Sequence, residues 1–153
     1  MGQRDNVVQI GIRMLENAVG QGFALGRASL ASAGEKSLAI KGYDPVAYFT
    51  DGKPTHGLPD FEYQWDEHRY RFASAQHRDL FRADPVRYAP QFANFCAMSL
   101  AKGELVEADP ESWLINADKL YIFGKREGPE LFRQDLAGNI AKSNQNRSLI
   151  GAH

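Results

Sequence analysis

Apolar residues near the start of the chain recur at the spacing of an α-helix. They stand four, three and four positions apart, at Val8, Ile12, Leu15 and Val19. Polar residues lie between them, so residues 5–19 are predicted to form an amphipathic helix with one apolar face. Residues 20–36 are mostly small and include four glycines, as is typical of a linker. We therefore expect an N-terminal amphipathic helix and linker over residues 1–37 and a compact domain over residues 38–153.

Two pairs of segments in this domain have the pattern of β-hairpins. Residues 61–65 and 69–73 alternate aromatic with polar side chains across a three-residue link, which suits a tight turn. Residues 113–115 and 120–123 are apolar and are joined by a short, mainly polar segment. A further short strand is predicted over residues 38–40.

Capping residues and prolines predict short helices between and after the hairpins. The predicted starts are Asp44, Ser74, Asp84 and Pro129. Another helix is expected over residues 97–102, ended by Gly103. Together these elements predict an α+β fold, with a small antiparallel sheet from two hairpins packed with short helices and further helices at both ends.

The helix predicted from Pro129 is the C-terminal one. Its apolar residues Phe132, Leu136 and Ile140 are each four positions apart, which is a helical spacing. The sequence turns polar at Lys142, and we expect the chain to fray beyond it.

Residues 84–97 combine two prolines, three aromatic residues and the only cysteine of the chain. Prolines interrupt a continuous helix, and the aromatic side chains need a core to cover them. This stretch is predicted to be a buried turn between helices, with Cys96 at or just beneath the surface of the core.

The charge balance and the cysteine count exclude several classes of protein. The chain has 153 residues, of which 18 are basic and 19 are acidic, and its formal net charge is −1. It therefore has no overall positive electrostatic field that would favour binding of nucleic acid. One cysteine permits neither an internal disulfide nor a paired-cysteine zinc site. Neither a leader nor a transmembrane segment is evident from the apolar runs. We therefore expect a cytoplasmic location rather than a periplasmic one.

Six short blocks follow one another in a fixed order along the domain. They are residues 41–49 (KGYDPVAYF), 70–74 (YRFAS), 84–92 (DPVRYAPQF), 96–97 (CA), 119–121 (KLY) and 138–142 (GNIAK). Together they resemble the YHS domain family and are most similar to its small stand-alone bacterial members. Many such relatives are similar to exported proteins, which keeps a periplasmic location as the alternative.

The chain also departs from the pattern of this family at several positions. Metal-binding YHS modules have cysteines at positions that correspond here to Ala47, Ala73 and His77, and thiolates are what such sites offer to soft metals. Their replacement implies that the metal site is lost and that no cofactor is bound. The stand-alone relatives have a glycine pair where this chain has Ala93 and Asn94, which argues against a positive φ there.

Cys96 leaves two interpretations open. A cysteine between Phe95 and Ala97 is usually a small buried hydrophobic residue, and this interpretation is favoured. Its predicted place at the start of a helix would also suit a reactive thiolate.

The internal histidines have no helical ligand spacing between them. His68 is expected in a solvated turn, His77 on the first turns of a helix and His56 in a loop. A mixed site of Cys96 with His77 or His56 would suit copper or zinc, and this is the alternative to the absence of a metal.

Aromatic residues such as Tyr48 and Tyr88 are predicted to belong to the core, with the lining of a ligand pocket as the alternative. The favoured function is therefore a non-enzymatic binding or interaction protein that takes a small ligand or a protein partner. The alternative is a thiol-dependent redox or metal-handling protein built on Cys96. No catalytic residue is predicted, and a homodimer through the N-terminal helix is expected.

Overall fold

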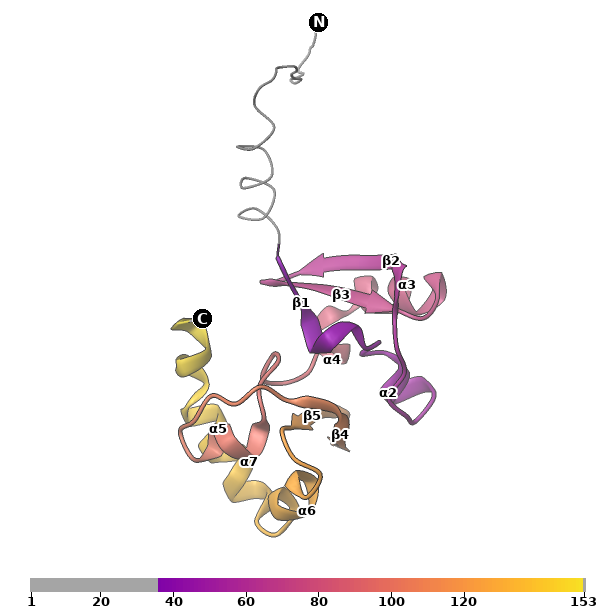
Figure 1. Cartoon of the computed structure of the whole chain (residues 1–153). Coiled ribbons are helices and arrows are strands. Elements are labelled where there is room, and N and C mark those ends of the chain that lie inside the picture. The colour runs from indigo at the N-terminus through magenta and orange to yellow at the C-terminus, as the bar shows by residue number, and fades with distance from the viewer. Residues whose placement is uncertain (1–35, 153) are drawn as a thin grey trace, which may run out of the picture. The chain divides into compact units, whose positions relative to one another are not determined.

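The computed structural model describes residues 36–152, which form a mixed α+β domain (Figure 1). The predicted helix over residues 5–19 and the linker after it, apart from Lys36, lie outside the described residues. The elements are β1 (Ser37–Leu38), η1 (Ala39–Gly42), α2 (Ala47–Thr50), β2 (Leu58–Trp65), β3 (His68–Phe72), α3 (Ala75–Ala83), α4 (Pro85–Tyr88), α5 (Ala97–Ala101), β4 (Asp109–Asn116), β5 (Lys119–Phe123), α6 (Gly128–Arg133), α7 (Leu136–Gln145) and η2 (Arg147–Ala152). The predicted α+β class is confirmed.

Both predicted hairpins are present. Strands β2 and β3 are antiparallel, with Trp65 opposite His68, and β4 and β5 are antiparallel, with Leu114 opposite Tyr121. The structure refines the prediction because the hairpins belong to separate sheets, ordered β1-β3-β2 and β4-β5. The first sheet is mixed, since β1 pairs with β3 in parallel.

The predicted strand over residues 38–40 is wrong at its end. Strand β1 stops at Leu38, and the chain continues as η1. Ile40 and Lys41 have φ values of 39° and 54°, in the left-handed region that a β-strand does not use. Ala93 also has a positive φ, 54°. The expectation that a residue other than glycine would not adopt a positive φ at this position was therefore wrong.

The C-terminal helix differs most from its prediction. It is divided into α6 and α7, because Asp135 has an extended φ of −147° and its Oδ1 accepts a hydrogen bond from the Gly138 N–H at 3.3 Å. This side chain caps α7. The expected fraying after Lys142 is also wrong: the hydroxyl of Ser143 donates to the Ala97 carbonyl, and Asn146 Nδ2 donates to the Leu100 carbonyl.

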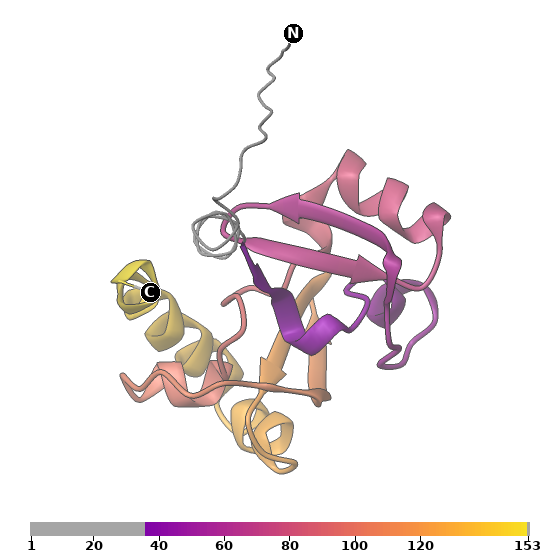
Figure 2. The ribbon, with the colours of Figure 1, turned by 45° about the horizontal axis from the view of Figure 1, so that its top comes forward.

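Two groups of buried side chains form the interior. The first core lies among η1, α2, β3, α3 and β5, and the second among α5, β5, α6 and α7. Figures 1 and 2 show the β2–β3 hairpin and α3 at one end and α5, α6 and α7 at the other, with β4 and β5 between them.

Strand β5 serves both cores. Leu120 and Ile122 pack into the first core, whereas Tyr121 and Phe123 pack into the second. Side chains alternate between the two faces of a strand, so a strand with both faces buried is apolar throughout. This accounts for the continuous apolar run in β5.

The buried turn predicted over residues 84–97 is present only in its second part, because Asp84, Val86 and Arg87 are exposed and residues 85–88 form α4. Helix α4 ends at Tyr88, which packs into the first core, and the chain then crosses to Phe92 and Cys96 in the second. The Cys96 N–H donates to the Val106 carbonyl at 2.8 Å. Within residues 36–152, no helix is both long enough and apolar enough to span a membrane.

Candidate functional site

A buried carboxylate, Asp44, lies at the centre of the contacts that link α2 to β3 and α3. It is fully buried. Its Oδ1 accepts hydrogen bonds from the N–H groups of Val46 and Ala47 at 2.9 and 3.3 Å. Its Oδ2 lies 2.9 Å from the Ala73 N–H and 2.6 Å from Nδ1 of His77. The capping hydrogen bonds predicted for Asp44 are present, although α2 begins at Ala47 and not at Pro45. The carboxylate has two further partners far along the chain.

Three residues that were expected to mark a lost thiolate site, Ala47, Ala73 and His77, all contact this carboxylate. Ala47 and Ala73 each donate a backbone hydrogen bond to Asp44, and His77 contacts the same carboxylate through its ring. Two of the three side chains are methyl groups, which offer no ligand atom, and the carboxylate is already occupied by protein N–H groups. This donor set does not fit a soft metal ion.

His77 is held from both sides. Its backbone N–H donates to Ser74 Oγ at 3.1 Å at the start of α3. Its second ring nitrogen, Nε2, lies 3.2 Å from Thr50 Oγ1 at the end of α2. The hydroxyl of Thr50 also lies 2.9 Å from Asp51 Oδ1. Sequence reasoning missed Thr50, because its contact with His77 depends on packing between residues 27 positions apart.

Cys96 lies at the wall of a cavity of about 250 Å³. The thiol residue is 4% exposed and precedes α5, where its Sγ accepts from the Ser99 N–H at 3.4 Å. The lining combines apolar and charged residues: Cys96, Met98, Ser99, Lys102, Glu104, Val106, Gly124, Lys125, Glu127, Gly128 and Leu131. Among these, Val106 and Leu131 are exposed, at 41% and 40%.

The predicted ligand residues are not brought together. His56 is exposed and its ring packs at a tilt against Tyr43, with 4.3 Å between ring centroids, and Cys96 belongs to the second core. Residues 36–152 contain no group of three or more histidine, cysteine, aspartate or glutamate side chains suited to hold a metal ion. The proposed mixed site of Cys96 with His77 or His56 has no geometric support.

Tyr48 and Tyr88 occupy the first core rather than a pocket. The hydroxyl of Tyr48 donates to the Pro110 carbonyl at 2.8 Å, and burial raises the pKa of this phenol well above its ordinary value. The ring of Tyr88 packs edge-on against Phe49, with 5.5 Å between centroids. Their aromatic surfaces are used in packing.

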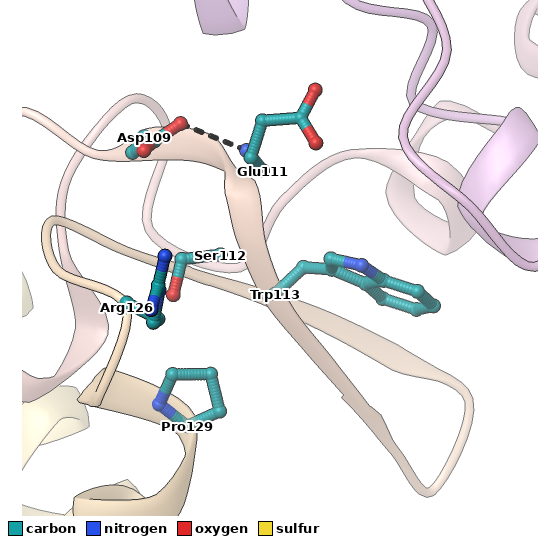
Figure 3. Close-up of a pocket in the computed structure, with 6 residues that line it drawn as sticks. All are labelled: Asp109, Glu111, Ser112, Trp113, Arg126 and Pro129. Atoms are coloured by element: carbon teal, nitrogen blue, oxygen red, sulfur yellow. Dashed lines mark hydrogen bonds between the residues drawn. The ribbon is translucent and has the colours of Figure 1, made fainter.

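A second cavity, of about 340 Å³, was not foreseen from the sequence. It is lined by Asp109, Glu111, Ser112, Trp113, Arg126 and Pro129. Figure 3 shows the Glu111 carboxylate and the Trp113 ring pointing away from Arg126. The Tyr43 hydroxyl donates to Glu111 Oε2 at 2.7 Å, and this hydrogen bond raises the pKa of Tyr43 to about 12. Glu111 thus has a structural partner, and the cavity lacks an arranged acid–base pair.

Comparison of the chain with family models, with curated proteins and with solved structures gave no match.

Proposed function

We propose that this protein is a YHS-like binding module that takes up an apolar group of a small ligand or a protein partner in the Cys96 cavity. The observation that carries the proposal is the placing of exposed Val106 and Leu131 beside the Cys96 cavity. Apolar side chains in a concave site, with a few polar groups around them, are typical of ligand sites. Lysine and glutamate side chains of both signs surround this cavity and would orient the bound group.

The contacts of Asp44 support binding without a metal. Ala47, Ala73 and His77 stand where the metal-binding relatives that the sequence resembles have thiolates, and all three contact the Asp44 carboxylate. We therefore expect purified protein to hold no stoichiometric zinc or copper. Elemental analysis that found one tightly held metal ion per chain would contradict this part of the proposal.

The cavity is tested with a defined amphipathic probe, 1-anilinonaphthalene-8-sulfonate, which is an anion with an apolar ring system and whose fluorescence rises on leaving water. We expect saturable binding to the full chain. Val106→Glu should weaken it about tenfold or more, because a charge next to the apolar walls costs more than 1.4 kcal/mol. Val86→Glu is the matched control, since Val86 is 71% exposed and lies outside this cavity.

Two outcomes would overturn the cavity proposal. One is the lack of saturable probe binding by the folded full chain. The other is equal binding by the Val106→Glu and Val86→Glu variants, both with unchanged thermal unfolding. If the probe does bind saturably, its displacement by small hydrophobic compounds would begin to define the ligand.

A thiol-dependent function is the second candidate, favoured by the hydrogen bond from the Ser99 N–H to Cys96 Sγ. A donor to sulfur stabilises a thiolate. Alkylation of the native chain by iodoacetamide across pH tests it: an apparent pKa near or above the ordinary thiol value of about 8.5 would exclude a reactive thiolate. The burial of Cys96 predicts slow alkylation.

We also propose that the segment predicted as a helix over residues 5–19 joins two copies of the chain. Its apolar stripe would be covered in such a pair, and symmetric dimers are the commonest oligomers. Light scattering of the full chain should report a dimer, and Ile12→Glu should convert it to a monomer. Equal masses for the two proteins would refute this role.

A further inference from the structure

Asp44, His77 and Thr50 form a continuous chain of hydrogen-bonding groups that ends at the surface. Asp44 Oδ2 lies 2.6 Å from Nδ1 of His77, and Nε2 of the same ring lies 3.2 Å from Thr50 Oγ1. A nucleophile within hydrogen-bond reach of a base, with the base oriented by a third group, is the signature of an activated nucleophile. Such arrangements are recognised by geometry and not by residue order.

The carboxylate fixes which ring nitrogen faces the hydroxyl. Asp44 is fully buried, and three backbone N–H groups hold its oxygens in place. A carboxylate accepts hydrogen bonds, so it selects the tautomer of His77 that carries a proton on Nδ1. In the neutral ring, Nε2 then presents its lone pair to Thr50 Oγ1. The buried Asp44 carboxylate thus orients the His77 ring. The His77 side chain is itself 14% exposed, so part of the ring reaches the surface.

Thr50 is an exposed residue, and its hydroxyl has one proton for three acceptors. Besides His77 Nε2, it lies 2.9 Å from Asp51 Oδ1 and 3.3 Å from the Val46 carbonyl. Thr50 and Gly52 are exposed, and apart from the chain neighbours of Gly52 nothing lies within 4 Å of where a Cβ would be at that residue. A small electrophile therefore has access to the Thr50 oxygen.

We propose that Thr50 is a nucleophile activated by His77 and that the protein transfers an acyl group from small activated esters to this hydroxyl. Thr50 Oγ1 forms a bond to the acyl carbon while its proton passes to His77 Nε2. The ester C–O bond breaks, and the leaving alcohol or phenol takes the proton. Water then attacks the acyl-threonine, gives a proton to Nε2 and releases a carboxylic acid, and Thr50 regains its proton.

The exposure of Thr50 defines the class of substrate. Thr50 is an exposed residue, so selection would come from the reactivity of the ester and from a small acyl group. Thr50 and His77 are the catalytic residues of this proposal. Asp44 is a positioning residue, because it acts through the ring of His77.

The test uses the full chain and p-nitrophenyl acetate, with release of p-nitrophenolate and peptide mapping of the acetylated residue as the two readouts. We expect acetylation at Thr50, and we expect Thr50→Val to abolish it there. Thr55→Val is the matched control: Thr55 donates to the Lys53 carbonyl, and its loss should change neither readout.

Two further variants separate the chemistry from the fold. His77→Asn keeps an amide N–H near the position of Nδ1 and removes Nε2, so acetylation should slow about 100-fold. Asp51→Ala removes the competing acceptor, and acetylation should proceed at least as fast as in the unmodified chain. Thr50 and Asp51 are exposed, so their variants test the proposal even if His77→Asn unfolds.

The proposal fails if Thr50→Val is acetylated at the rate of the unmodified chain. It also fails if the acetyl group is found only on lysine or histidine side chains, or if Asp51→Ala loses acetylation while it remains folded. None of these outcomes depends on the Cys96 cavity, so the two proposals stand or fall separately.

Discussion

Asn94 Oδ1 accepts a hydrogen bond of 2.6 Å from the backbone N–H of Ile40, 54 residues earlier in the chain. Ile40 is 2% exposed, and its φ of 39° ends β1. The turn that joins the two cores thus holds the start of the domain in a left-handed conformation. An isoleucine in this region is under strain, and the hydrogen bond compensates for it.

Asn94→Ala should lower the free energy of unfolding by about 1–3 kcal/mol, because the buried N–H of Ile40 would lose its acceptor. Chemical denaturation of the full chain measures the change. Asn144→Ala is the control: Asn144 is exposed and its side-chain Oδ1 accepts from Arg147 at the surface, so loss of this side chain should cost no more than about 0.5 kcal/mol. Equal effects of the two substitutions would contradict the role of Asn94.

Ala93→Gly should stabilise the protein by roughly 0.5 kcal/mol. The φ of Ala93 is 54°, which costs an alanine about 1–2 kcal/mol and costs glycine almost nothing. Part of this gain is offset by the larger entropy of the unfolded glycine chain. Ala141→Gly, at an exposed position in α7, should instead destabilise by about 1 kcal/mol. The opposite signs make the pair a direct test of backbone strain.

The sequence predicted elements whose cause is local. The two hairpins follow from alternation across short links, and the caps at Asp44 and Ser74 follow from residue types beside a proline or a helical stretch. What it did not predict depends on distant partners. The positive φ of Ile40 needs Asn94, and the break between α6 and α7 needs the cap by Asp135, which overrides a helical spacing that continues through it. The contact of His77 with Asp44 has no local signal at all.

Asp44→Asn should lower the free energy of unfolding by about 3 kcal/mol, since an amide nitrogen cannot accept the hydrogen bonds that the buried carboxylate now accepts. If the amide nitrogen took the place of Oδ2, it would face two hydrogen-bond donors, the Ala73 N–H and the His77 ring. Asp79→Asn is the control, because Asp79 is exposed and pairs with Arg82 at the surface; it should cost less than about 1 kcal/mol. A small effect at Asp44 would mean that water replaces these contacts.

His68 should make the protein less stable as the pH falls below neutrality. His68 begins β3 and is half-buried, so the solvated turn expected for it was wrong. This burial lowers the pKa of its ring, while the carboxylates of Asp66 and Glu67 oppose the shift. The unfolded chain, in which histidine titrates near 6.5, therefore binds a proton more readily than the folded one. Stability rises with pH between the folded and the unfolded pKa and is fully present above the unfolded value.

The measurement is urea unfolding of the full chain and of His68→Gln at about pH 7.5 and about pH 5.5, on either side of the unfolded histidine pKa. Acidification should reduce the free energy of unfolding more in the unmodified chain than in the variant. Every other titrating group is common to both proteins, so the difference isolates His68. Above about pH 7.5 the ring is neutral in both states and the difference should no longer vary with pH. A variant that lost as much stability on acidification as the unmodified chain would show that burial of His68 does not restrain its protonation.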